Sequence, residues 1–355
     1  MSNIEKIDPN LKTNHLFNEP GIKYYSVFSA PFSLYGFYEP EKQSAFTRLP
    51  EEVAKATNDG VAALYRNTAG GRVRFKTSSK YVVVSAVLPD VCRFPHMPLS
   101  GTTGFDLYLN NKGKSVYHGS LTPPVDLKDS FESIQRFNSE AVRDITINFP
   151  LYNSVSELYI GLDENAVLEQ GDEYIDIKPI LYYGSSITQG GCASRPGNSY
   201  QAVISRKLNC DYINLGFSGN ARGEKAIADY MSGLDVSLFV CDYDHNAPNY
   251  THLADTYPYL YKIFREKKPN LPIIFISKPD IRLKSEEDIK RRDVIYQNYS
   301  RAIAAGDRNI YFIDGYSLFG DDGHDDCTVD GCHPTDLGFR RMADSIGGLI
   351  ETILF

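Results

Sequence analysis

Residues 180–190 read Ile-Leu-Tyr-Tyr-Gly-Ser-Ser-Ile-Thr-Gln-Gly, a short apolar run that ends in glycine and two serines. The apolar part is typical of a buried strand, and the Gly-Ser-Ser step predicts a tight turn into a helix. Similar short strands are expected at 212–215, 236–241, 273–277 and 310–314, with amphipathic segments between them. Alternating strands and helices predict a parallel sheet with helices on both faces.

Two of these amphipathic segments carry clear helix signals. Apolar or small residues at 295, 299, 302 and 303 share one helical face, and Ser285 with Asp288 predicts a capping pair at its start. In the closing segment, apolar residues at 339, 342, 346, 349 and 353 line one face. Pro334 is expected at the first position of this last helix.

The first half of the chain follows a different pattern. Arg72–Thr77 alternates apolar with polar residues, and Tyr81–Val87 is β-branched and continuous. More strands are expected at 105–109, 115–118, 145–149 and 156–162, separated by Gly, Asn and Pro. This predicts an all-β sandwich of jelly-roll type, with one short helix at 51–65. The acidic stretch Glu169–Glu173 separates the two patterns, so we expect domains at 1–177 and 178–355.

Length and composition agree with two soluble domains and exclude several classes of partner. The chain has 355 residues, with 37 basic and 45 acidic side chains and a net charge of −8. That balance argues against nucleic acid or an anionic membrane as the main partner. There is no Trp, so a platform of stacked Trp for sugars is excluded, although the 25 Tyr could stack instead. Met1–Lys6 lacks the apolar core of a signal peptide, and no apolar run is long enough to cross a bilayer. A cytoplasmic location is therefore expected, or a secreted or periplasmic one if a leader was removed.

The six cysteines do not predict a disulfide scaffold or a metal knuckle. No pair has the Cys-x-x-Cys spacing. Cys327 and Cys332 are close enough in sequence to form a bridge, but we expect reduced thiols.

The candidate catalytic residues lie where the strands of a parallel sheet end, which is where such folds place function. Ser186 follows the first strand at the start of a helix; on its own it could simply be a helix cap. Asp330 precedes His333 by three residues across a turn at Gly331, so its carboxylate could reach His333 Nδ1 and fix the tautomer. Together the three residues offer a nucleophile, a base and a group that orients the base.

Two further loops offer donors for a developing oxyanion. Asn214–Asn220 follows the second strand and contains glycines that would let a backbone N–H approach a substrate oxygen. Asp242–Pro248 follows the third strand, and Asn246 supplies an amide at the same edge. Read separately, both are ordinary turns.

Four elements resemble, in their order along the chain, the four blocks of the SGNH (GDSL-like) hydrolase superfamily over residues 178–355. They are the turn at Ser186, Asn214–Asn220, Asp242–Pro248 and the Asp330–His333 pair. The resemblance implies a flavodoxin-like three-layer α/β/α domain in which Ser186 is the nucleophile, His333 the general base and Asp330 the residue that orients His333. It also implies an oxyanion hole made of the N–H of Ser186, the N–H of Gly219 and the side chain of Asn246. Ser185 stands where the family usually has Asp, which is not the triad acid.

A second resemblance lies in the first half. Residues 104–108, Gly-Phe-Asp-Leu-Tyr, are similar to the Gly-x-Asp-Leu-Tyr signature of a β-sandwich domain that precedes SGNH domains in some bacterial hydrolases. It does not imply that these residues are catalytic.

The resemblance implies a serine esterase that hydrolyses short acyl esters, acetyl above all, on a carbohydrate, through an acyl-enzyme and without metal or organic cofactor. Two alternatives stay open: a lysophospholipase or thioesterase on the same fold, and a catalytically inactive carbohydrate-binding protein. The acidic loop Asp321–Asp326 lacks calcium-loop spacing and is expected to be solvated, as is the charged face Lys284–Arg292. His245 is expected to line the pocket rather than act as a second base. The acyl group, the alcohol and the oligomeric state stay open.

Overall fold

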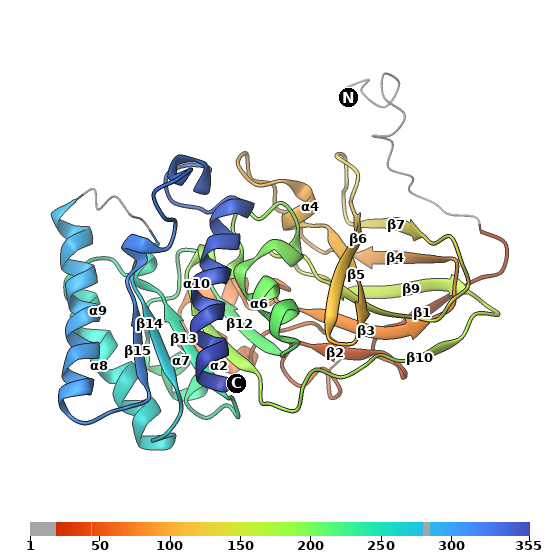
Figure 1. The fold of residues 1–355 in the computed structure, drawn as a ribbon. Coiled ribbons are helices and arrows are strands. Elements are labelled where there is room, and N and C mark those ends of the chain that lie inside the picture. The colour runs from red at the N-terminus through yellow and green to blue at the C-terminus, as the bar shows by residue number, and fades with distance from the viewer. Residues whose placement is uncertain (1–18, 44, 280–284) are drawn as a thin grey trace.

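The computed structural model describes residues 19–43, 45–279 and 285–355. The expectations for Met1–Lys6 and for Lys284 lie outside the described residues. The chain forms two antiparallel sheets in its first half and one parallel sheet with helices in its second half (Figure 1). The predicted combination of an all-β region and an α/β region is therefore confirmed.

The first half is a sandwich of two antiparallel sheets. One sheet has the order β1 (Ile22–Ser26), β9 (Glu157–Asp163), β4 (Tyr81–Val87) and β7 (Ser130–Arg136). The other has the order β10 (Leu168–Gln170), β3 (Arg72–Thr77), β8 (Arg143–Asn148), β5 (Phe105–Asn111) and β6 (Lys114–Leu121), and β2 (Ser33–Tyr35) pairs with β3.

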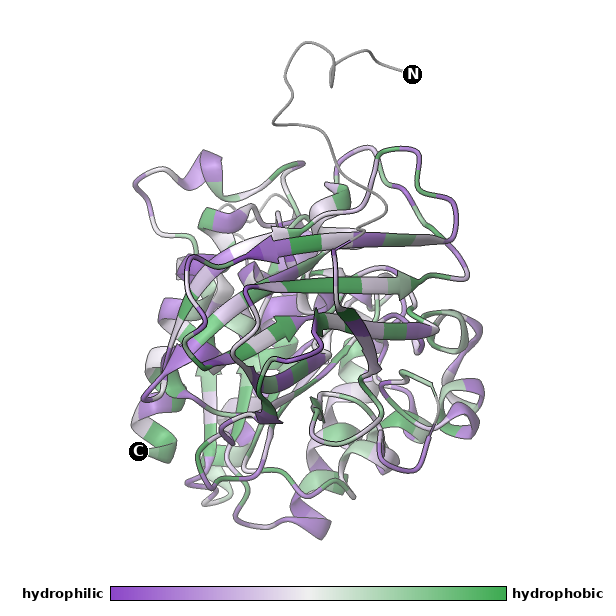
Figure 2. Ribbon diagram, turned by 90° about the vertical axis from the view of Figure 1, so that its right-hand side faces the viewer, coloured by the Kyte–Doolittle hydropathy of each residue, from purple (hydrophilic) through white to green (hydrophobic). Residues whose placement is uncertain are grey.

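The core of the sandwich lies between these sheets. Val82, Val84 and Ile160 of one sheet share an apolar cluster with Phe75 and Ile147 of the other, and all five are fully buried. Figure 2 shows hydrophobic and hydrophilic residues alternating along strands of this half. That alternation is the period-2 pattern from which the central strands were predicted. The short or polar strands β1, β2, β7 and β10 were missed because they carry few apolar residues.

Two short helices of the first half leave the sandwich and cover part of the second half. The single helix expected at 51–65 is wrong: α2 (Glu51–Thr57) and α3 (Asp59–Leu64) are separated by Asn58, whose backbone is extended. Asn58 Oδ1 accepts a hydrogen bond from Val61 N at 2.8 Å and so caps α3. Ala54 and Val61 are buried in the same cluster as residues of the parallel sheet. A third short helix, α4 (Leu99–Thr102), precedes β5.

The second half is built on a five-stranded parallel sheet. Its order is β12 (Tyr212–Gly216), β11 (Ile180–Gly184), β13 (Leu238–Asp242), β14 (Ile273–Ile276) and β15 (Ile310–Ile313). This 2-1-3-4-5 order is the flavodoxin-like one. All five residues of β11 are buried, because helices cover both faces of the sheet.

Each face of the parallel sheet has its own apolar cluster. Helices α6 (Tyr200–Leu208) and α10 (Asp336–Leu354) pack on the face that carries Ile180 and Tyr182. The opposite face is covered by α7 (Lys225–Met231), α8 (Tyr250–Lys267) and α9 (Glu286–Ala304). The remaining helical turns are α5 (Ser186–Gln189), η2 (Pro196–Asn198), η3 (Asp244–Asn246), η4 (Gly315–Ser317) and η5 (His324–Cys327).

The helix starts show one confirmed prediction and one correction. Ser285 caps α9, and its Oγ accepts from Asp288 N at 3.1 Å, as predicted. Pro334 is not the first residue of α10: Thr335 is the cap, and its Oγ1 accepts from Gly338 N at 3.4 Å. Pro334 instead forms an isolated β-bridge with Thr328, which closes the loop before the helix. The predicted apolar face of α10 packs inward, with Phe339, Met342 and Ile346 fully buried.

The remaining sequence expectations concern cysteines, charged segments and membranes. None of the six cysteines forms a disulfide. The four acids of the Asp321–Asp326 loop are exposed. Arg291 and Lys290 of α9 pair with acids one turn earlier. Within the described part of the chain, no helix has the length and apolarity needed to span a bilayer.

Candidate active site

The two adjacent serines after β11 do different things. Ser185 Oγ accepts a hydrogen bond from Ile187 N at 3.1 Å and caps α5, so the helix-cap interpretation belongs to Ser185. Ser186 begins α5, and its Oγ lies 2.9 Å from His333 Nε2. Ser186 is 8% exposed. The structure therefore leaves Ser186 available for chemistry beside an imidazole.

Asp330 holds His333 from the other side of the ring. Its Oδ2 lies 2.8 Å from His333 Nδ1, and its Oδ1 accepts from the backbone N–H groups of His333 and Cys332 at 2.8 and 3.0 Å. Gly331 has φ +80°, a left-handed conformation that closes this turn. With Nδ1 donating to the carboxylate, the lone pair of neutral His333 is on Nε2, which faces Ser186.

The hydrogen bonds also determine the charge of Asp330. Burial raises the pKa of this carboxyl, but the hydrogen bonds from the backbone and ring of His333 outweigh burial and bring the pKa to about 2. Asp330 is therefore an anion at neutral pH, which favours the imidazolium that forms when His333 takes a proton.

Gly219 and Asn246, the other predicted site residues, lie in loops that are tied to each other and to α5. Asn246 Nδ2 donates to Phe217 O at 2.8 Å, so one of its two amide hydrogens links the loops after β13 and β12. Ser218 N donates to Gln189 Oε1 at 2.9 Å. Gly219 has φ +70°, and a Cβ there would meet no atom within 4 Å, so backbone conformation rather than space favours glycine.

Two backbone N–H groups in these loops have no protein acceptor among the described residues. Among the described residues, the N–H groups of Ser186 and Gly219 make no hydrogen bond. For Ser186 this follows from its place in the first turn of a helix, where N–H groups have no partner within the helix. Such donors, held by a rigid backbone, are suited to receive an oxyanion.

The sequence did not reveal that the first half of the chain also reaches this site. Tyr152 Oη donates to Ser186 O at 3.1 Å, and burial raises the Tyr152 pKa above its usual value. Phe94 packs edge-on against Tyr152, with ring centroids 5.5 Å apart. The His96 ring lies 5.6 Å from the His333 ring. No motif marks these three residues, because only the packing of the sandwich brings them here.

His245 lies beside the loop that carries His333, next to Cys332. Its Nδ1 lies 3.7 Å from Cys332 Sγ, and its Nε2 is buried with no hydrogen-bond partner in the described part of the chain. Burial, together with the positive charges of Lys278 and His333, lowers the His245 pKa to about 3. The ring is therefore neutral at neutral pH.

The Gly-Phe-Asp-Leu-Tyr signature joins the sandwich to the segment that follows α5. Asp106 is fully buried, and its Oδ2 accepts from Arg195 Nη1 at 2.9 Å and from Gly197 N at 2.8 Å. Tyr108 Oη also bonds to Arg195. The motif is therefore structural: it fixes the loop between α5 and α6 against β5.

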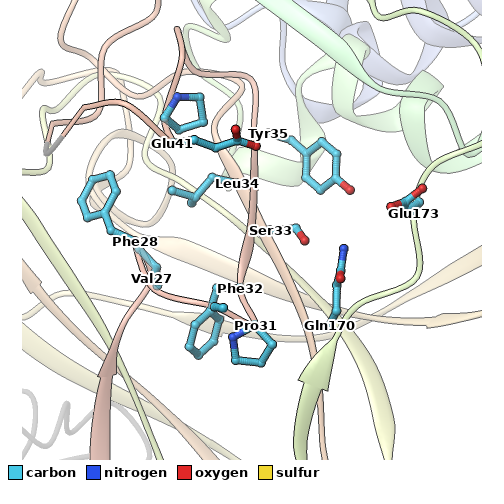
Figure 3. A pocket seen from close by; sticks show the side chains of 12 residues that line it. Val27, Phe28, Pro31, Phe32, Ser33, Leu34, Tyr35, Glu41, Gln170 and Glu173 are labelled. Atoms are coloured by element: carbon cyan, nitrogen blue, oxygen red, sulfur yellow. The ribbon is translucent and has the colours of Figure 1, made fainter.

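Two other features could hold a ligand. A cavity of about 370 Å³ lies beside β2 and β10 and is lined by residues such as Phe32, Tyr35 and Gln170 (Figure 3), but no triad residue lines it. Within the described residues, one group of three metal-ligating side chains lies close together: His96, Cys192 and His333.

Two families match the two halves of the chain. Residues 177–351 match the GDSL-like lipase/acylhydrolase family, and residues 22–168 match the GxDLY family, the N-terminus of SGNH-hydrolase-type esterases. No relative among the curated proteins matches the sequence.

Solved structures resemble the chain over nearly its full length. A protein described as a GDSL-like lipase from Bacteroides ovatus is 29% identical, with a TM-score of 0.85 over 94% of this chain and 98% of the other. The salicylyl-acyltransferase of a tetracycline biosynthetic pathway is 18% identical, with a TM-score of 0.76 over 95% and 99%. An acetyl xylan esterase from the rumen bacterium Butyrivibrio proteoclasticus is 13% identical, with a TM-score of 0.59 over 94% and 98%.

The last two similarities show the fold alone. The family matches say more, because each covers one of the two regions that the fold distinguishes. Residues 177–351 belong to the GDSL-like lipase/acylhydrolase family of hydrolases, and residues 22–168 to the GxDLY family that forms the N-terminus of SGNH-hydrolase-type esterases.

Proposed function

We propose that this protein is a serine esterase in which Ser186 is the nucleophile, His333 the general base and Asp330 the group that orients the base. The observation that carries the proposal is the unbroken contact from Ser186 Oγ to His333 Nε2 at 2.9 Å and from His333 Nδ1 to Asp330 Oδ2 at 2.8 Å. This is the arrangement that nucleophilic acyl transfer requires.

The proposed reaction has two matching halves. Ser186 Oγ attacks the acyl carbonyl while His333 Nε2 takes the hydroxyl proton, and Asp330 stabilises the imidazolium. The tetrahedral intermediate then collapses: its bond to the alcohol oxygen breaks, and Nε2 returns the proton to that oxygen. Water next attacks the acyl-enzyme with His333 again as base, which releases the acid and restores Ser186.

The oxyanion of each intermediate would be held by the N–H of Ser186, the N–H of Gly219 and the second amide hydrogen of Asn246. The two backbone donors are supported by their lack of a protein acceptor in the described residues. The Asn246 bond to Phe217 O holds the amide in a fixed orientation, so little reorganisation is needed as charge develops.

For the substrate, we propose a short acyl ester, acetyl above all, on a carbohydrate. The support is the fold shared with an acetyl xylan esterase and with a family two carbohydrate esterase from Clostridium thermocellum solved with cellohexaose (TM-score 0.57). The absence of Trp means that a bound sugar would rely on Tyr stacking and hydrogen bonds.

Hydrolysis of p-nitrophenyl acetate tests the mechanism. Ser186→Ala should lower kcat by at least about 10³-fold, because the nucleophile is lost. Ser185→Ala is the matched control, because it removes a hydroxyl one residue away that caps α5, and it should keep far more activity. Equal activity of wild type and Ser186→Ala would refute the mechanism.

A fluorophosphonate probe tests the nucleophile without a chosen substrate. Mass spectrometry should locate the label on Ser186 in the wild type and find none in Ser186→Ala. A wild-type protein that takes no label would favour the inactive carbohydrate-binding alternative.

The substrate proposal needs its own comparison. Rates on acetyl and octanoyl esters separate a short-acyl esterase from a lysophospholipase or thioesterase, and a panel of acetylated sugars assayed beside Ser186→Ala identifies the alcohol. Faster turnover of the octanoyl ester would contradict the acetyl preference while leaving the triad intact.

A further inference from the structure

Three side chains from three separate loops meet at the mouth of the candidate active site. His96 lies in the segment between β4 and α4, Cys192 follows α5, and His333 precedes α10. One ligand atom from each lies within 4.8 Å of the other two. The proposed ester hydrolysis uses only His333 of these three, so it does not explain why His96 and Cys192 lie here.

The ligand set fits a specific class of metal ion. Thiolate sulfur and imidazole nitrogen are the ligands of Zn²⁺ and similar borderline-soft cations, whereas Mg²⁺ and Ca²⁺ prefer oxygen. With Zn–S and Zn–N bonds of about 2.3 and 2.1 Å, tetrahedral ligand atoms lie about 3.3–3.6 Å apart. The observed atoms would need to approach one another by no more than about 1.5 Å.

The loop that carries His96 is held in place by residues before and after His96 in the chain. Cys92 N donates to Asn153 Oδ1 at 2.7 Å, and Phe94 packs against Tyr152. Met97 is buried in the cluster that packs under α10. His96 is therefore presented to the site by an ordered segment, which lowers the entropy cost of binding an ion.

Cys192 is equally constrained. Its backbone has φ +72°, which few residues other than glycine adopt, and its side chain is 7% exposed. Gly190 and Gly191 precede it in the turn that ends α5. The strained backbone keeps the thiol beside the catalytic histidine.

His333 can offer only one nitrogen. Its Nδ1 is occupied by Asp330, so a metal would bind Nε2, the atom that lies 2.9 Å from Ser186 Oγ. A ligated Nε2 has no lone pair left to accept a proton. A cation bound here would therefore stop general-base catalysis, and water or Ser186 Oγ could complete four-coordination.

We propose that His96, Cys192 and His333 form an inhibitory site for Zn²⁺ or a similar borderline-soft divalent cation, which joins the sandwich to the catalytic loops and occupies the base. The binding part of this inference stands on the three side chains alone; the inhibition rests on the proposed esterase activity.

Binding must release a proton. A cysteine binds a metal ion as its thiolate, so the thiol hydrogen must be lost on binding. The S–H bond breaks as the Zn–S bond forms, and the proton leaves to solvent, so calorimetry in buffers of different ionisation enthalpy should detect it.

The binding test uses the full-length Ser186→Ala protein, so that turnover plays no part. Calorimetry with Zn²⁺ should show one site, and His96→Asn or Cys192→Ala in this background should weaken it at least about ten-fold, since loss of even an outer partner of a metal ligand costs that much. Cys92→Ser, an exposed thiol four residues from His96, is the matched control and should bind as tightly as its parent.

The inhibition test uses the protein with Ser186 intact. Zn²⁺ should inhibit p-nitrophenyl acetate hydrolysis, EDTA should restore it, Mg²⁺ should not inhibit, and His96→Asn should shift the inhibition curve to higher Zn²⁺. Equal Zn²⁺ affinity of the parent, His96→Asn and Cys192→Ala, or no saturable binding at all, would overturn the site. Specific binding by a protein that hydrolyses no ester would instead refute the proposed function and leave the site standing.

Discussion

The contribution of Asp330 is set by three hydrogen bonds at a single carboxylate. Oδ1 is held by two backbone N–H groups, which leaves Oδ2 directed at His333 Nδ1. The backbone bonds keep the carboxylate ionised and in place, while the ring bond selects the tautomer of His333. Asp330 is therefore proposed to act through His333 rather than on the substrate.

This proposed role predicts that kcat falls less when Asp330 is replaced than when His333 is replaced. Asp330→Asn should lower kcat by about 10²–10⁴-fold, less than His333→Ala, and change KM little, because the nucleophile and the base both remain. Steady-state kinetics on p-nitrophenyl acetate measure both variants. A loss in Asp330→Asn as large as that in His333→Ala would argue that the carboxylate does more than orient the base.

His245 predicts a pH dependence of stability. Its folded pKa of about 3 is lower than the value of about 6.5 for an unfolded histidine, so between these values the unfolded chain binds more protons. Stability should therefore be lost as pH falls from about 6.5, at no more than about 1.4 kcal/mol per pH unit. Urea unfolding of wild type and His245→Gln at pH 7, 5.5 and 4.5 should show a smaller loss in the variant. An equal dependence of the unfolding free energy on pH in the two proteins would contradict the lowered pKa of His245.

At the scale of elements, α3 is anchored at its first turn to the loop that carries Gly219. Asn58 caps α3 through Oδ1, and its Nδ2 donates to Asn220 O at 3.0 Å and to Glu224. Gly60 lies against Asn220, where a Cβ would approach the side chain to 2.0 Å. A helix of the first half thus supports one wall of the proposed oxyanion hole.

A comparison of two capping asparagines distinguishes the effect of capping a helix from the effect of the additional bonds that Asn58 makes. Asn249 caps α8 through a bond from His252 N at 2.9 Å and is exposed, so Asn249→Ala should cost about 1 kcal/mol of unfolding free energy. Asn58→Ala should cost more, about 2–3 kcal/mol, because its partly buried partners, Asn220 O and Glu224, also lose a hydrogen bond. Chemical denaturation measures both, and equal costs would mean that Asn58 acts only as a cap.

At the scale of the whole molecule, buried charges join the two halves. Arg48 is buried and donates to Gly216 O at 2.6 Å and to Asn214 O at 3.2 Å, at the end of β12. Arg72 of β3 pairs with Asp211, next to the start of the same strand. Asp106 and Arg195 form a further ion pair between the sandwich and the second half. Because the halves contact each other at several points, we expect them to unfold together.

The Asp106–Arg195 pair provides the test of this interface. Asp106→Ala leaves a partly buried guanidinium and the Gly197 N–H without their acceptor and should cost about 3–5 kcal/mol. Asp172→Ala breaks the exposed pair with Lys76 and should cost no more than about 1 kcal/mol. Thermal unfolding compares them, and Asp106→Asn serves if the alanine variant does not fold. Similar costs at the two sites would show that the signature does not hold the halves together.

Local patterns in the sequence determined the apolar strands of both halves, the helix cap at Ser285 and the Asp330–His333 pair, because each depends on neighbours within a few residues. The sequence analysis missed the strands with few apolar residues, which depend on pairing with a neighbouring strand. It also missed the break at Asn58 and misplaced the start of α10 at Thr335, because single side-chain hydrogen bonds decide both.

Only the tertiary structure showed that Ser186, which the family resemblance named, lies beside His333. It also showed that Tyr152, His96 and Arg48 of the first half lie around the loops of the candidate active site. These contacts join residues far apart in the chain, often by more than a hundred positions. No local periodicity encodes such distances. They follow from how two packed cores meet, which is why residues of the β-sandwich contact Ser186 and His333.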